Sequence, residues 1–107
     1  MAQILMAQFD LCRHGRSRRY PFLLDLQADM LRDLATRVVA PLTPLKRMGG
    51  KPISRLNPVV AVDGAQYAIL FQELAAVPLT AMGDPVGSLR GRRDELIAAL
   101  DLLFTGV

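Results

Sequence analysis

Near the start of the chain, a stretch of alternating apolar and polar positions and a stretch of bulky apolar residues each predict a β-strand. The first covers residues 6–12 (MAQFDLC), and the second covers residues 20–27 (YPFLLDLQ). The segment between them, RHGRSRR, is basic and contains glycine and serine, which is typical of a turn. We therefore expect these two strands to form a hairpin.

Further strands are predicted in the middle of the chain. Residues 36–42 (TRVVAPL) contain two adjacent β-branched valines before a proline, and residues 75–83 (AAVPLTAMG) predict a further short strand. Residues 59–71 (VVAVDGAQYAILF) hold two apolar runs around Asp63-Gly64, a pair that favours a type I′ hairpin turn. Residues 43–58, with three prolines and a Gly-Gly pair, predict a long excursion with room for one weak strand.

The last segment, roughly residues 90–104, is predicted to be helical. Its apolar residues recur at spacings of four and three and form a stripe that consists of Leu96, Leu100, Leu103 and Val107, flanked by Ile97 and Phe104. Acidic residues lie in the early turns, the favourable sign for the helix dipole, and Gly106 fits a left-handed cap. The stripe is wide, so we expect one part to pack on the sheet and another part to need a partner.

Five or more short antiparallel strands followed by one C-terminal helix indicate a mainly β protein, a small, partly open barrel of the SH3-like kind. A chain of 107 residues suffices for one modest core, so a single domain is predicted over residues 1–107. The tripeptide MAQ occurs at Met1 and again at Met6, which makes Met6 a candidate natural start and residues 1–5 an upstream extension.

Composition adds an expectation about assembly and location. Apolar residues make up 51% of the chain, and the mean hydropathy is +0.26, which is rich for so small a domain. No stretch approaches the roughly 18 consecutive apolar residues of a transmembrane helix, so we expect a second copy to cover the surplus in a homodimer. The single cysteine, Cys12, excludes an internal disulfide, and no signal-peptide pattern is present; both features indicate a cytoplasmic protein.

Residues that could support catalysis or bind a metal are few. His14, the only histidine, lies near Cys12, but no second cluster supplies further ligands. Asp25 and Asp29 are four residues apart in extended chain and would not sit as a general acid and base pair. The residues alone therefore predict no catalytic group, no metal and no cofactor.

Two stretches of the chain share a set of short motifs with one protein family. SRRYPFLLDLQADML continues through LATRVVAPL, and LNPVVAVDGAQYAILFQELAAVPLTAMG precedes a helix that ends in an aromatic residue, any residue, glycine and an aliphatic residue. The set consists of Tyr20, Asp25-x-Gln27-x-Asp29, Arg37-Val38-Val39, Pro58-Val59-Val60 and Val77-Pro78. From about Met6 to Val107, the chain resembles the CcdB family.

The resemblance implies a cytoplasmic homodimer, built as an SH3-like barrel with a C-terminal helix, that acts as the toxin of a toxin–antitoxin module. Such toxins bind the A subunit of DNA gyrase and trap gyrase on cleaved DNA, without catalytic activity of their own. A cognate antitoxin neutralises them through a C-terminal segment that is disordered until it binds. The gyrase-binding positions carried over to this chain are Met30, Leu31, Asp101, Thr105, Gly106 and Val107.

In the expected dimer, the two C-terminal helices come together and bury Leu100, Leu103 or Phe104 across the two-fold axis. This chain departs from the family pattern at two of the gyrase-binding positions. Well-known members carry tryptophan where it has Thr105, and asparagine where it has Asp101. Interface energy concentrates in tryptophan, tyrosine and arginine, so the departure predicts weaker binding to gyrase. A homologue that does not act on gyrase and has another target is therefore an alternative.

Two other classes of protein remain as alternatives. A MazF-like endoribonuclease shares the barrel, but the strand that would hold its Arg-Pro dipeptide has Arg37-Val38 here. A small nucleic-acid-binding barrel could use the arginines of the first turn, given a net charge of +3 and a pI near 9.6. No aromatic stacking platform accompanies these arginines, so we expect solvated loop charge and no direct sequence-specific contact with nucleic acid.

Overall fold

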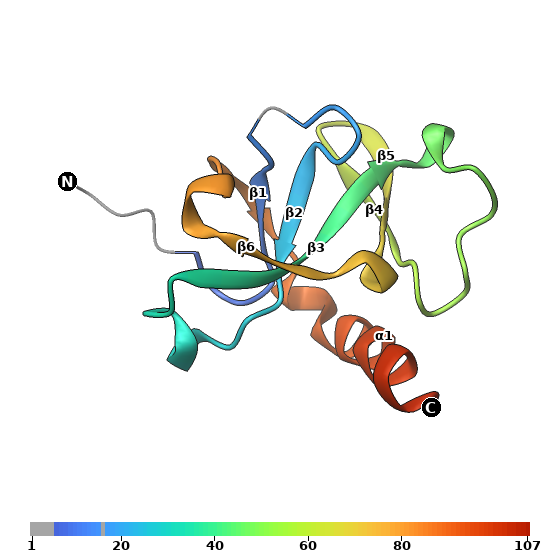
Figure 1. Cartoon of the computed structure of the whole chain (residues 1–107). Helices are drawn as coiled ribbons and strands as arrows, with labels where there is room; N and C mark the ends of the chain where they lie inside the picture. Colours follow the sequence, from blue (N-terminus) through green and yellow to red (C-terminus); the bar gives the residue numbers. More distant parts are fainter. Residues whose placement is uncertain (1–5, 16) are drawn as a thin grey trace.

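The protein folds as a curled antiparallel sheet with one helix at its C-terminus (Figure 1). A computed structural model describes residues 6–15 and 17–107; the predicted extension over residues 1–5 and the turn residue Arg16 lie outside this range. The strands are β1 (Asp10–Arg13), β2 (Phe22–Asp25), β3 (Thr36–Pro44), β4 (Val59–Val62), β5 (Ala65–Ile69), β6 (Ala75–Pro78) and β7 (Pro85–Ser88). The helix α1 spans Arg93–Thr105. The predicted fold class, a small SH3-like barrel with a C-terminal helix, is confirmed.

The long strand β3 gives the sheet its curl. The strand order is β4-β5-β3-β2-β1-β7, and β6 also pairs with β3. The beginning of β3 pairs with β6, its middle with β2 and its end with β5, all antiparallel. The strand β3 thus pairs with three neighbours at successive positions along its length, and the sheet bends into a half-barrel.

The β4–β5 hairpin has the predicted turn. Val62 pairs directly with Ala65, which leaves a two-residue loop. Its residues, Asp63 and Gly64, have φ angles of 51° and 81°. Positive φ at both central positions is the requirement of a type I′ turn.

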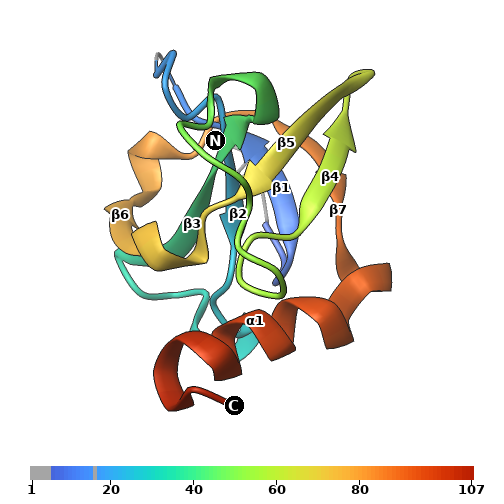
Figure 2. The same ribbon diagram turned by 90° about the vertical axis from the view of Figure 1, so that its right-hand side faces the viewer.

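The helix α1 lies against one end of the sheet in both views (Figures 1 and 2). Leu96 and Ala99 are fully buried in the main core, together with Phe9, Leu24, Ile69 and Phe71. Gly106 ends the helix in the predicted left-handed conformation, with φ 74°, and its N–H donates to the Leu102 carbonyl at 3.0 Å. Among the described residues, no helix is long and apolar enough to cross a bilayer.

Two strand predictions need correction. The strand predicted over residues 6–12 begins only at Asp10, because Phe9 adopts a φ of 68° that interrupts extended chain. The strand β7 was not predicted at all; its sequence, PVGS, holds proline and glycine, the residues that sequence patterns associate with turns. It pairs with the outer edge of β1 and contributes the last strand in the order.

Cys12 and His14 lie in different surroundings. Cys12 is fully buried in a small second core with Leu23 and Val39, and burial raises the pKa of its thiol to about 11. A thiol with that pKa is almost entirely protonated at neutral pH and is a poor nucleophile. His14 is half-buried in the β1–β2 loop, where its Nδ1 lies 2.9 Å from the Tyr20 carbonyl oxygen.

Candidate interaction surface

The end of α1 presents uncovered apolar side chains. Phe104 is 70% exposed and Val107 is 75% exposed, whereas Leu96 on the same helix is fully buried. Asp101 and Thr105 are exposed as well, and the Thr105 hydroxyl donates to the Asp101 carbonyl at 2.6 Å. The helix thus anchors the tail through its buried face and leaves the last turn and its cap in solvent.

A second exposed apolar site lies on η1 (Asp29–Leu31), the 3-10 turn that follows β2. Met30 is 86% exposed and Leu31 is 47% exposed. Methionine is usually buried because its side chain is apolar, and exposed methionine is frequent at binding surfaces because that side chain is flexible. These two side chains are the ones that the family resemblance singled out.

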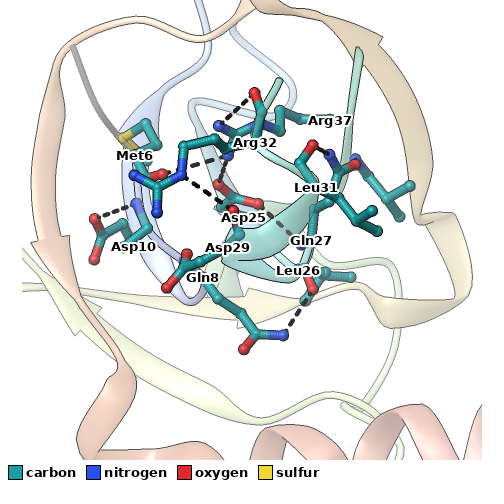
Figure 3. A network of polar contacts seen from close by, with 12 residues as sticks. Met6, Gln8, Asp10, Asp25, Leu26, Gln27, Asp29, Leu31, Arg32 and Arg37 are labelled. Atoms are coloured by element: carbon teal, nitrogen blue, oxygen red, sulfur yellow. Dashed lines mark hydrogen bonds and ion pairs between the residues drawn. The ribbon is translucent and has the colours of Figure 1, made fainter. Parts of the chain in front are cut away.

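A buried glutamine holds η1 in place. The Gln27 amide Nε2 donates to the Leu31 carbonyl at 2.8 Å, and its Oε1 accepts from the Val38 N–H at 3.1 Å (Figure 3). The backbone N–H of Gln27 donates to the Asp25 carboxylate at 2.9 Å. One side chain therefore connects the end of β2, the turn η1 and the beginning of β3.

The Asp25 carboxylate forms an ion pair with Arg37 in the interior (Figure 3). Asp25 is fully buried, and Arg37 is only 5% exposed. Further Arg37 contacts reach the Met6 carbonyl at 3.4 Å and the Arg32 carbonyl at 3.5 Å. Arg37 thereby connects the N-terminal segment, the strand β3 and the chain after η1.

Burial raises the pKa of Asp25, although the Gln27 N–H and the Arg37 guanidinium both favour its charged form. The Arg37 Nε is buried and has no hydrogen-bond partner among the described residues. We name Asp25, Gln27 and Arg37 the polar clamp. The hydrogen bonds that the polar clamp does form all go to the protein's own backbone or join Asp25 to Arg37, so it has the character of a structural support and not of a reactive centre.

One protomer does not bring the two exposed sites together. Figure 1 places the turn that contains η1 on the far side of the molecule from the last residues of α1. Met30 and Leu31 therefore do not form a continuous patch with Thr105, Gly106 and Val107 in a single chain.

The residues predicted for the dimer interface differ in accessibility. Leu100 and Leu103 are half-buried and pack against the main core of their own chain. Phe104 is the member of this set that is free for a partner. The dimer interface itself stays a prediction.

Sequence reasoning missed three further exposed apolar residues, which are Leu34, Val38 and Leu79. Val38 pairs with Ala76 at the β3–β6 edge, and Leu79 begins the next turn after β6. The alternation at residues 37–39 held the signal, because buried Arg37 and Val39 flank Val38 and turn it to the opposite face. Of the three, Leu34 lies next to η1, where its N–H donates to the Leu31 carbonyl at 3.2 Å.

Within residues 6–15 and 17–107, no cluster of three or more histidine, cysteine or acidic side chains could hold a metal ion. In a comparison with protein families, the model described as CcdB protein matches residues 8–106. The matched range includes η1, the polar clamp and α1 up to its glycine cap.

Proposed function

Because this chain belongs to the CcdB family of toxins from toxin–antitoxin systems, we propose that it binds the A subunit of DNA gyrase and traps gyrase on cleaved DNA. In this proposal it has no catalytic activity and needs no cofactor. It acts in the cytoplasm as a single toxin domain over residues 1–107, and a cognate antitoxin neutralises it through a segment that folds on binding.

The observation that supports a partner at the C-terminus is the exposure of Phe104 and Val107 on a helix whose other face is buried. Uncovered large apolar side chains gathered at one place mark interaction sites more often than scattered ones do. We propose that the gyrase-binding residues are Met30, Leu31, Asp101, Thr105, Gly106 and Val107. Since η1 and the helix end lie apart in one chain, a dimer that places them side by side would give a continuous surface.

A DNA-cleavage assay tests the proposed activity. Supercoiled plasmid is incubated with purified gyrase, ATP and increasing amounts of the protein, and detergent and protease then release any trapped breaks. We expect linear DNA to accumulate in proportion to the protein. If no linear DNA forms at any concentration, while a quinolone control produces it, gyrase is not the target of this protein.

We predict no ribonuclease activity. The Arg37 guanidinium, the counterpart of the MazF-like strand arginine, is buried against Asp25 and cannot reach an RNA phosphate. Incubation with labelled single-stranded RNA should leave the RNA intact. RNA cleavage that follows the protein peak through a second purification step would instead favour the MazF-like alternative.

We predict that Phe104→Glu weakens a homodimer without unfolding the protomer. Phe104 is 70% exposed in the single chain, so a charge there costs the fold little, whereas burying that charge in an interface is strongly unfavourable. Sedimentation equilibrium should show a dimer dissociation constant raised at least about tenfold, roughly 1.4 kcal/mol. The matched control, Ser54→Glu, adds the same charge at an exposed loop position and should leave the dimer unchanged. If the wild type is monomeric at all concentrations, the proposed dimer interface does not exist.

We predict that Thr105→Trp tightens binding to a gyrase A fragment. A buried tryptophan covers roughly 150–250 Å², far more than threonine, and the apolar difference is worth on the order of 2–3 kcal/mol at about 25 cal/mol per Å². Affinity should therefore rise roughly thirty- to a hundred-fold, and Asp101→Asn should act in the same direction by a smaller step. Calorimetric titration measures both changes.

Thr105→Val is the control for that comparison. It removes the hydroxyl that donates to the Asp101 carbonyl and keeps the size of the side chain, so it should bind like the wild type. Tightening by valine as strong as that by tryptophan would mean that the lost hydroxyl, and not the aromatic area, changes affinity.

A further inference from the structure

A basic cleft lies at the end of the barrel that is remote from α1. It has a volume of about 820 Å³ and is formed by the β1–β2 loop, the turn η2 (Leu45–Arg47) and the beginning of β5. Figures 1 and 2 both place these elements on the opposite side of the sheet from the helix. We name it the distal cleft. Its volume is within the range of ligand-binding clefts, about 300–1,000 Å³.

The charge of the distal cleft has one sign. Arg18, Lys46 and Arg47 line it, and none of the described residues that line it is acidic. In the described part of the chain, none of these three side chains forms an ion pair with a carboxylate. The nearby carboxylate of Asp63 is itself 3.7 Å from the Arg13 guanidinium. An uncompensated group of cations around a concave surface favours an anionic ligand.

The floor of the distal cleft includes a free edge of the sheet. The strand β5 pairs with β3 only from Tyr67 to Ile69, because β3 ends at Pro44 and the chain turns into η2. Ala65 and Gln66 pair with β4 on one side only, and no strand of residues 6–15 and 17–107 pairs with their other side. Such an edge can accept the backbone of an added extended segment.

The remaining lining of the distal cleft is apolar. Pro21, Pro44 and Leu45 contribute to its walls, and the Tyr67 ring packs edge-on against Phe22 with 5.1 Å between ring centroids. A second copy of this chain is a poor occupant, because it would bring like charges together. A single-stranded nucleic acid stacks its bases on exposed aromatic rings, and the Tyr67 ring in this cleft is instead packed against Phe22.

We propose that the distal cleft binds an extended acidic peptide segment of a partner protein. The peptide backbone lies beside Ala65 and Gln66, its carboxylates face Arg18, Lys46 and Arg47, and an apolar side chain contacts Leu45. This site is separate from η1 and the end of α1, so the inference does not depend on gyrase being the target.

The test is a titration of the isotope-labelled full chain with a fluorescent peptide of sequence Asp-Val-Glu-Leu-Glu-Val-Asp, capped at both ends. We expect saturable binding, with amide shift changes that concentrate at Lys46, Arg47 and residues 65–67. The double variant Arg18→Glu/Lys46→Glu should weaken binding about tenfold or more, since two exposed charge contacts become repulsions. A peptide with Asn and Gln in place of its acidic residues should bind the wild type no more tightly than the acidic peptide binds the double variant.

The matched control is Lys51→Glu/Arg90→Glu, which makes the same change in net charge at exposed positions outside the distal cleft. It should retain wild-type affinity. Equal weakening in both double variants, or shifts spread over the whole basic surface, would reduce the effect to overall charge and overturn the proposal. Absence of peptide binding, with a single-stranded oligonucleotide causing the shifts at residues 65–67, would make the cleft a nucleic-acid site instead.

Discussion

Replacing Asp25 with alanine is expected to lower the free energy of unfolding by about 3–5 kcal/mol, the usual result of removing one partner of a buried ion pair. Asp25 is fully buried and Arg37 nearly so, which means that the guanidinium would stay in the interior without its counter-charge. The Gln27 N–H would lose its acceptor as well. Urea unfolding followed by circular dichroism measures the change, and small domains have only about 5–15 kcal/mol in total.

Two further variants separate the charge from the packing. Asp25→Leu/Arg37→Met removes both charges and should recover most of the loss, because a buried pair replaced by apolar residues is often neutral. Asp29→Ala removes an exposed carboxylate that accepts from the Gln8 N–H, and should cost no more than about 1 kcal/mol. If Asp25→Ala proves as mild as Asp29→Ala, the polar clamp does not support the fold.

Where Asp25→Ala does not fold, Asp25→Asn provides the same test at lower cost. Asparagine keeps an acceptor for the Gln27 N–H and removes only the negative charge. Its unfolding free energy should lie between those of the wild type and the alanine variant. An asparagine variant as stable as the wild type would mean that the charge on Asp25 contributes nothing.

The second large effect is expected from removal of Thr105, Gly106 and Val107. All three are exposed and none contributes to the core, so the shortened chain should fold and melt within a few degrees of the full chain. Binding to a gyrase A fragment should fall at least about a hundred-fold, because the proposed contact residues at the tail are lost.

The single substitution Gly106→Ala is the control for the truncation. It keeps the tail and disturbs only the left-handed cap, where φ is 74°, at a cost of roughly 1–2 kcal/mol. If the shortened chain melts far below this variant, the tail acts mainly as a cap. Unchanged gyrase binding by the shortened chain would place the contact elsewhere.

Local sequence signals predicted the elements whose structure depends on neighbouring residues. Asp63-Gly64 specified its own turn because only residues that tolerate positive φ fit a type I′ loop. Phe9 escaped prediction for the converse reason, since nothing in its side chain favours a φ of 68°. Its strain is offset by tertiary contacts, among them the Leu89 N–H that donates to its carbonyl at 2.7 Å.

The candidate site was less accessible to sequence reasoning than the fold. The Asp25–Arg37 pair depends on strand register, in which Asp25 lies opposite Val39, and register could not be derived from the pattern. Val107 continued the helical stripe in the sequence, yet it is exposed because Gly106 turns the chain out of the helix. Met30 and Leu31 entered only through the family resemblance, since adjacent apolar residues after a strand would ordinarily predict core.

The central claim is that this chain binds the A subunit of DNA gyrase, and titration of the full-length protein into a purified gyrase A fragment by calorimetry tests it most directly. The account predicts saturable binding in the micromolar range, weaker than an interface with a tryptophan anchor would give, and tightened by Thr105→Trp. Absence of heat and of complex for both the wild type and Thr105→Trp would contradict it and assign this barrel to another target.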